Sequence, residues 1–175
     1  MRARSCTIDS SCINALDHLD LVPQLSVLFS PVLVPKAVRK ELFRRRVTKD
    51  RLQFIFSTYG FFQRCDGYDQ GTVDFLLAER HRLGVKDRGE VEAVVQASQL
   101  GAAVIVDDLW GRDLAALADL DFHGTVWVLH RFYQLRLLSS TLGDYFAVLR
   151  DRGMRLPWET VNELLVSVGE EPLKA

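Results

Sequence analysis

The sequence predicts an α/β fold, a three-layer α/β/α sandwich around a mostly parallel sheet, with further helices at the C-terminal end. Short apolar runs alternate with helix-like patterns through the first 124 residues, which is typical of parallel sheets covered by helices. The run at residues 102–106, AAVIV, has no polar residue, as expected for a strand buried on both faces. Residues 125–175 show helical periodicity only. We therefore expect an α/β domain over residues 1–124 and a helical extension over 125–175 that packs on it.

The N-terminal part contains two predicted strands, each followed by a helix. Residues 6–8 form a short apolar run, and a helical pattern follows over residues 11–19. Residues 32–34 form the second apolar run. Pro35 then favours a helix over residues 36–45, because proline is well tolerated where a helix begins.

The pattern is weakest between residues 48 and 86. Two aromatic-rich runs, at residues 52–56 and 61–65, are each compatible with a strand, and helical spacing resumes at Thr72. The rest of the chain is clearer. We expect strands at 102–106 and near 121–122, and helices over 88–100, 109–117, 125–138, 141–149 and 157–168.

Composition excludes several classes of protein. The 175-residue chain is 48% hydrophobic and 26% charged, which is typical of a globular domain and not of a disordered chain. Its three cysteines have no CxxC pairing and fit neither a disulfide framework nor a zinc site. No apolar stretch is long enough to cross a bilayer, and the first residues do not resemble a secretory signal. We therefore expect a cytoplasmic protein with no membrane partner.

The charge is balanced overall but uneven along the chain. The formal net charge is −1, which argues against purely electrostatic binding of nucleic acid. Residues 36–51 nevertheless carry a net charge of +6 and include Arg44, Arg45 and Arg46 in succession. This arginine run has two interpretations, a solvated helix end or a track for phosphate groups beside a reactive site.

Acidic residues gather where ligands bind in parallel sheets, beyond the carboxyl ends of the strands. Asp9 directly follows the first predicted strand, and Asp107 and Asp108 directly follow the strand at 102–106. Further acids lie on the helices next to these strands, namely Glu41, Glu90 and Glu92. An all-oxygen ligand set suits Mg²⁺ or Mn²⁺ rather than zinc. Such a set is costly without a cation, because close carboxylates repel one another.

Each acid also has a purely structural interpretation. Asp9 and Asp108 precede helices, where aspartate is a common N-cap. Glu90 fits a capping box with Asp87, and Glu41 could pair with an arginine one turn away on a solvated helix face. Only the joint placement of these acids favours a metal site. The pattern alone leaves both interpretations open.

Five segments of the chain together look like a known family. They are TIDSSCINAL, LVPKAVRKELFRR, DRGEVEAVVQASQLGAAVIVDDLWGRDLA, GTVWVLHRFYQLRLL and LRDRGMRLPWETVNELLVSVGE. They resemble PIN-domain ribonucleases, especially the VapC-like toxin branch with a helical C-terminal extension. The resemblance extends over nearly the whole chain apart from about residues 48–86.

This resemblance implies a PIN-like fold and a catalytic, metal-binding quartet made of Asp9, Glu41, Glu90 and Asp108. Glu92 is the alternative third acid. It lies two residues from Glu90, which places the two side chains about 200° apart around a helix, so we expect only one of them to face the site.

The resemblance also implies roles for residues around the quartet. Asp107 or Asp113 would assist it, and Ser10 matches a position where the family often has a small polar residue. One or two Mg²⁺ or Mn²⁺ ions would activate a water for attack on a phosphodiester. The arginine run and Arg112 would contact RNA, although Arg112 fits a salt-bridged helix position equally well.

The implied function is a metal-dependent endoribonuclease, the toxin of a type II toxin–antitoxin pair. The implied partners are RNA, a small antitoxin protein and a second copy of the chain in a homodimer. The alternative is a catalytically inactive PIN-like scaffold that binds protein or RNA and keeps the acids as helix caps. A structure-specific DNA nuclease is a third alternative, which the absence of a helical clamp disfavours.

Overall fold

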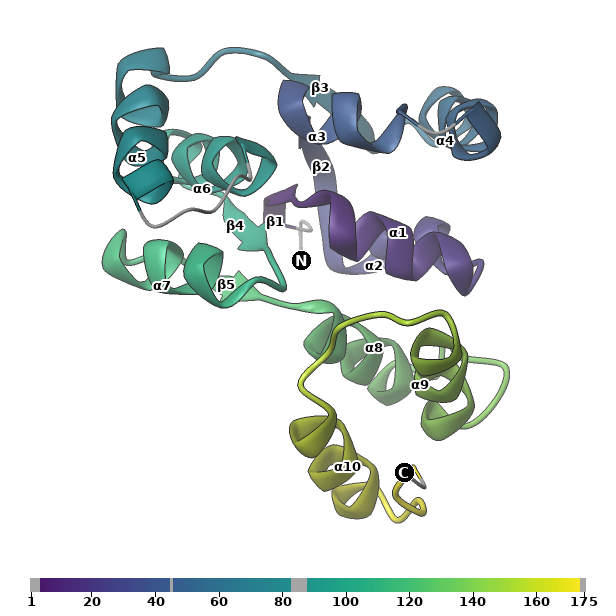
Figure 1. The fold of residues 1–175 in the computed structure, drawn as a ribbon. Coiled ribbons are helices and arrows are strands. Elements are labelled where there is room, and N and C mark those ends of the chain that lie inside the picture. Colours follow the sequence, from purple (N-terminus) through teal and green to yellow (C-terminus); the bar gives the residue numbers. More distant parts are fainter. Residues whose placement is uncertain (1–3, 45, 83–87, 174–175) are drawn as a thin grey trace.

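The computed structural model describes residues 4–44, 46–82 and 88–173 (Figure 1). Within these ranges the chain forms a five-stranded sheet in the order β3-β2-β1-β4-β5, and every strand pair is parallel. The strands are β1 (Arg4–Ile8), β2 (Phe29–Pro35), β3 (Phe62–Cys65), β4 (Ala103–Ile105) and β5 (Phe122–His123). The predicted parallel sheet is therefore confirmed. Its central strand is β1, and β4 lies beside β1.

Helices cover both faces of the sheet. Alternate side chains of a strand point to opposite faces. Ile8 and Ile105 belong to a large hydrophobic cluster on one face, while Val104 and Val106 belong to a smaller one on the other. The large cluster includes side chains from α1 (Ser10–His18), α2 (Leu25–Leu28), α3 (Lys36–Leu42), α4 (Arg46–Thr58) and the C-terminal helices. The smaller cluster includes α6 (Arg88–Leu100) and α7 (Leu109–Leu117), and α5 (Gln70–Arg82) packs on α6.

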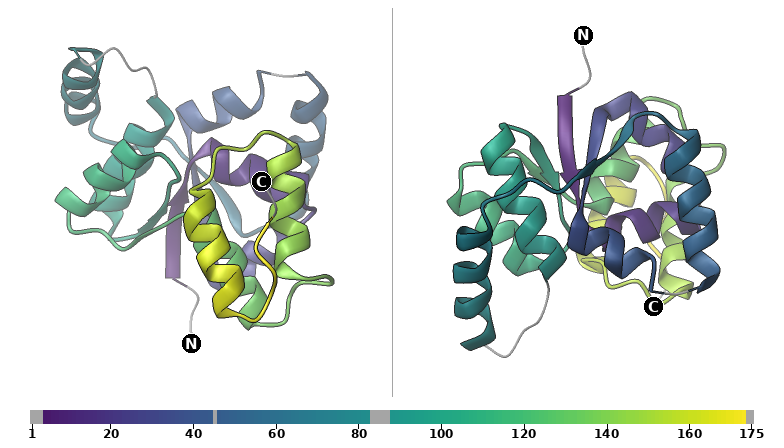
Figure 2. Two further views of the ribbon diagram at one scale, coloured as in Figure 1. Left: turned by 60° about the horizontal axis from the view of Figure 1, so that its bottom comes forward. Right: turned by 90° about the horizontal axis from the view of Figure 1, so that it is seen from above.

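Figure 2 shows the same division in two further views, with α5, α6 and α7 on one side of β1 and the remaining helices on the other. The short 3₁₀ helix η1 (Val22–Gln24) connects α1 to α2. The three-layer α/β/α arrangement is therefore confirmed. The helices over 88–100 and 109–117 begin and end at the predicted residues.

The structure decides between the two candidate strands after β2, and it shortens the helix expected over 36–45. Residues 52–56 are helical and belong to α4, in which Ile55 is buried while its neighbour Phe54 is 66% exposed. A short apolar run does not by itself distinguish a helix from a strand, and here the second candidate, residues 61–65, contains the strand β3. The helix expected over 36–45 ends at Leu42, and α4 begins at Arg46.

The C-terminal helices share the large cluster of the sheet. They are α8 (Thr125–Gln134), α9 (Leu142–Asp151) and α10 (Trp158–Ser167). Phe132 and Phe146 are fully buried in the same cluster as Ile8 of β1. Thr141 and Asp144 form a capping box that opens α9. Among the described residues, no helix combines the length and the apolar character needed to span a membrane.

Candidate active site

Asp9 lies at the carboxyl end of the central strand and caps α1. Its side chain accepts hydrogen bonds from the Ser11 backbone N–H (3.1 Å) and from the Ser11 hydroxyl (2.6 Å), and only 4% of the residue is exposed. Burial raises the pKa of the Asp9 carboxyl above its ordinary value, the bonds from Ser11 oppose this shift, and the charge of Asp107 adds to it. The capping interpretation is confirmed, yet this cap is a buried carboxylate beside another acid.

The two aspartates after β4 have different surroundings. Asp107 is half-buried and accepts hydrogen bonds from the backbone N–H (2.7 Å) and hydroxyl (2.6 Å) of Thr125, so it connects the end of β4 to the start of α8. The buried Cys12 thiol donates to the same carboxylate at 3.2 Å. Asp108 is exposed and caps α7, accepting from the backbone N–H groups of Trp110 and Gly111. Asp107 therefore lies beside Asp9, while Asp108 is exposed to solvent at the start of α7.

Glu41 faces the acidic edge from α3. It is half-buried and accepts a 2.7 Å hydrogen bond from the hydroxyl of Ser10, the residue that follows Asp9 in the sequence. This bond fixes the Glu41 carboxylate close to Asp9. The first turn of α6 lies against the same carboxylate. A Cβ atom at Gly89 would lie 2.9 Å from Oε1 and 3.1 Å from Oε2 of Glu41. Only glycine leaves room for this close approach.

Glu90 and Glu92 are both buried, and they lie in different environments. Glu92 accepts hydrogen bonds from the Ala37 backbone N–H (2.8 Å), the Tyr68 hydroxyl (2.6 Å) and the Arg88 guanidinium (2.7 Å). It thereby holds the start of α3 against α6. Glu90 lies against α7 instead, because its Oε2 would be 3.5 Å from a Cβ atom at Gly111. Of the two, Glu90 is the one that lies next to the Asp108 cap.

These contacts link the four predicted acids as two separate pairs. On one side, Ser10 connects Asp9 to Glu41, whose carboxylate touches Gly89. On the other, Glu90 and Asp108 meet at Gly111. Within the described residues, no three Asp, Glu, His or Cys side chains converge closely enough to hold a metal ion as they stand. The donors are all carboxylate oxygens, which fits Mg²⁺ or Mn²⁺, and the raised pKa of Asp9 reflects a charge that a cation would stabilise.

Sequence reasoning missed the glycines of this edge. Gly89 and Gly111 give room to Glu41 and Glu90, and a Cβ atom at Gly124 would lie 2.8 Å from Oδ1 of Asp107. Gly89 is the second residue of α6, Gly111 is the third residue of α7, and Gly124 lies between the end of β5 and the start of α8. Those positions were a signal in the sequence, but the carboxylate that each glycine accommodates comes from a distant segment.

A cavity of about 350 Å³ lies beside Asp107. Arg112 of α7 contributes to one wall, and Trp127 and His130 of α8 together with Thr160 of α10 contribute to the other. The Arg112 guanidinium lies 5.8 Å from the centre of the Phe122 ring. No ion pair of Arg112 occurs within the described residues, so the salt-bridge interpretation finds no support there.

The predicted arginine run is only partly described. Arg44 is exposed in the turn that follows α3. Arg45 lies outside the described residues, as does the side chain of Arg46, and so does Asp87 of the predicted capping box. Their roles in RNA binding and capping remain predictions.

A family model described as a PIN domain matches residues 5–170. None of the curated proteins compared matches the chain. Two solved structures are similar to it, both at 12% sequence identity. VapBC2 from Rickettsia felis, bound to a DNA fragment from its promoter, has a TM-score of 0.43, with 69% of this chain and 98% of that one covered. PAE2754 from Pyrobaculum aerophilum has a TM-score of 0.46, with coverages of 77% and 99%. Because the family model spans almost the entire sequence, the chain belongs to the PIN-domain family.

Proposed function

We propose that the protein is a Mg²⁺- or Mn²⁺-dependent endoribonuclease. One observation carries the proposal: the buried carboxyl of Asp9 lies at the carboxyl end of the central strand β1, beside the carboxylate of Asp107 that follows β4. Membership of the PIN-domain family, whose members are generally nucleases, supports the same reaction class. Asp9, Glu41, Glu90 and Asp108 would hold the metal, with Asp107 beside them.

When bound, the metal would activate a water and offset the charge that builds on the phosphodiester during attack. The chain's own side chains orient the ligands. Ser11 fixes Asp9, Ser10 fixes Glu41, and Glu92 holds α3 so that Glu41 faces the edge. The hydrogen bonds from Ser11 oppose the rise in the pKa of Asp9 that burial causes.

The cavity beside Asp107 supplies groups suited to RNA. The Arg112 guanidinium can bind a phosphate, and the Trp127 ring can stack on a base. Trp127 is already stacked on His123, with ring centres 3.6 Å apart and planes 11° apart, so its orientation is fixed. The helical extension would thus form one wall of the substrate site.

The biological role that we propose is that of a toxin held inactive by a small antitoxin, acting as a homodimer in the cytoplasm. The five sequence segments that resemble the VapC-like branch support this role. Co-expression with the protein encoded next to it, followed by size-exclusion chromatography, tests it. A stable complex that loses ribonuclease activity is the expected result.

The test of the activity is cleavage of single-stranded RNA and DNA in Mg²⁺ and in EDTA, for the wild type, Asp9→Asn and Asp108→Asn. Asparagine caps a helix about as well as aspartate, so both variants should fold. We expect RNA cleavage by the wild type in Mg²⁺, none in EDTA, and a loss of orders of magnitude in both variants. The stabilisation of the protein by Mg²⁺ in thermal melts should shrink as well.

Folded variants that cleave as the wild type does, with an unchanged Mg²⁺ response, would reduce the acids to helix caps. A wild type that binds RNA but never cleaves it would favour the scaffold alternative. Cleavage of DNA in preference to RNA would favour the DNA nuclease.

A further inference from the structure

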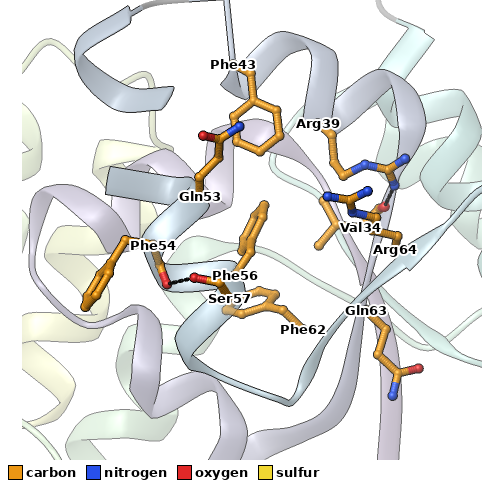
Figure 3. A pocket seen from close by; sticks show the side chains of 10 residues that line it. All are labelled: Val34, Arg39, Phe43, Gln53, Phe54, Phe56, Ser57, Phe62, Gln63 and Arg64. Atoms are coloured by element: carbon orange, nitrogen blue, oxygen red, sulfur yellow. Dashed lines mark hydrogen bonds between the residues drawn. The ribbon is translucent and has the colours of Figure 1, made fainter. Parts of the chain in front are cut away.

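A second cavity lies between α3, α4 and the edge strand β3. Its volume is about 460 Å³, within the range of about 300–1,000 Å³ that small-ligand sites occupy. Four phenylalanines, two arginines and two glutamines contribute to its lining (Figure 3). Arg39 of this cavity lies two residues before Glu41 on α3, a separation of about 200° around the helix. The cavity and the acidic edge therefore lie on different sides of α3.

Three of the phenylalanine rings form a continuous aromatic wall. The rings of Phe43 and Phe56 meet edge-on with centres 6.0 Å apart, and Phe56 and Phe62 are 4.8 Å apart. Phe43 and Phe56 are half-buried, so their rings are fixed by the core yet accessible from the cavity. Phe54 lies at the rim, and its ring is turned away from the other three (Figure 3).

Two guanidinium groups lie at the other end of the cavity. Arg39 donates a 2.6 Å hydrogen bond to the Val34 carbonyl and pairs with Asp66. Arg64 is the register partner of Val34 across the parallel pair β2–β3, so it lies next to Arg39 (Figure 3). Arg64 is exposed, and within the described ranges its side chain has neither a hydrogen-bond partner nor an ion pair. Arg39 is thus occupied, while Arg64 is available to an anion.

The part of the sequence that contributes the two bordering helices is basic. Residues 36–51 carry a net charge of +6 in the sequence, and this segment includes α3 and, from Arg46, the first turns of α4. A protein partner with an apolar helix would fit the rings, but it would leave the guanidinium of Arg64 without a counter-charge. Grooves that combine positive charge with aromatic side chains are typical of sites for single-stranded nucleic acid.

We propose that this cavity binds a base of single-stranded RNA, with the base against Phe43 and Phe56 and an adjoining phosphate at Arg64. Stacking on a ring is tolerant of sequence because every base has a π face, while amide groups such as that of Gln53 can hydrogen-bond a base edge. The identity of the ligand as RNA rests on the proposed ribonuclease function. The site would hold the strand on one side of α3 while the acids lie on the other.

The experiment is the binding of a fluorescein-labelled 12-nucleotide single-stranded RNA, followed by anisotropy in EDTA so that no cleavage occurs. Phe43→Leu keeps the apolar volume and removes the aromatic face. Arg64→Gln removes an exposed charge with little risk to folding. Tyr133→Leu is the matched control, because this ring of α8 is also half-buried but lies outside the cavity. Arg155→Gln is the control for Arg64, being exposed and distant in sequence.

Removing a stacking ring commonly weakens binding by about fivefold to a hundredfold, so we expect at least about fivefold for Phe43→Leu. Arg64→Gln should lower the slope of log affinity against log salt by about 0.7. Both controls should bind as the wild type does. Unchanged binding in both cavity variants overturns the proposal and leaves the cavity to a protein partner. Equal losses in Phe43→Leu and Tyr133→Leu also overturn it.

The proposed ribonuclease activity is tested independently of the proposed base site. The wild type is incubated with the same RNA in Mg²⁺, and the absence of cleavage would refute the proposed reaction. A loss of binding in the cavity variants would still establish the base site in that case. Intact cleavage with unaffected binding in both cavity variants would refute the base site alone.

Discussion

The two sides of α3 differ in almost every chemical respect. Glu41 points to the sheet edge next to Asp9, whereas Arg39 and Phe43, one helical turn apart, point to a cavity of rings and guanidinium groups. The acidic side is tight, since glycine is needed where Glu41 meets α6. The other side is open and basic. A helix of seven residues thus separates a candidate reaction site from a candidate binding site for the same substrate.

The largest effects on cleavage and stability should come from replacing each of the two glutamates of α6 by glutamine. Glu90→Gln should lower RNA cleavage by orders of magnitude at nearly unchanged stability, because it removes a charge from the acidic edge. Glu92→Gln should instead destabilise the fold by about 1–3 kcal/mol, because the buried partner of Arg88, Tyr68 and Ala37 loses its charge. Urea melts and initial cleavage rates measure both.

Comparison of the two variants at a temperature where both are folded is the control. A Glu92→Gln protein that is as stable as the wild type but inactive would contradict these assignments. Glu92, and not Glu90, would then be the metal ligand of the acidic edge.

The contrast between these two glutamates also shows what a sequence can predict. The parallel sheet, the strand-end acids Asp9 and Asp108, and the helix over 88–100 all follow from local patterns. Which glutamate faces the edge does not, because it depends on Ala37 and Tyr68, residues that lie more than twenty positions away. Local sequence patterns predict whether a segment is a helix or a strand, whereas tertiary contacts determine which way its side chains point.

The cavity on the basic side was beyond sequence reasoning for a related reason. Its walls come from the region after β2, where the run at 52–56 fitted a strand as well as a helix. Phe56 and Phe62 meet only because α4 folds back on the edge strand β3. Their shared surface leaves no periodic signal in the chain.

A smaller effect should follow from filling the space at Gly89. In Gly89→Ala, the new Cβ would lie 2.9 Å from a Glu41 oxygen, so that carboxylate must move. We expect cleavage to fall by about tenfold, as is common when support of a metal ligand is lost. Stability should hold or rise by up to about 1 kcal/mol, because alanine favours the helix.

Gly67→Ala is the matched control, because a Cβ there meets nothing within 4 Å. Its cleavage rate should equal that of the wild type. Full activity in Gly89→Ala would mean that the position of Glu41 does not matter, which contradicts its role as a ligand.

Substitutions on the basic side of α3 should change KM, whereas substitutions on the acidic side should lower the cleavage rate. Phe43→Leu should raise the KM for a single-stranded RNA about fivefold and leave kcat unchanged, because the stacked base is held equally in the ground and transition states. Steady-state cleavage of a short fluorogenic RNA measures both constants. A fall in kcat at constant KM would place the aromatic wall in the reaction site and erase the distinction between the two sides of α3.

The smallest effect should be a pH dependence of stability that belongs to the acidic side alone. The pKa of Asp9 is raised by burial and by the charge of Asp107. A carboxyl whose pKa is higher in the folded state binds its proton more tightly there, so stability falls as pH rises from its ordinary pKa of about 3.9 through the raised value. Melts in EDTA across this range should show the decline in the wild type. Asp9→Asn should flatten it, whereas Arg64→Gln should not. An equal decline in Asp9→Asn would show that other carboxyls cause it and that Asp9 is not the strained charge of this edge.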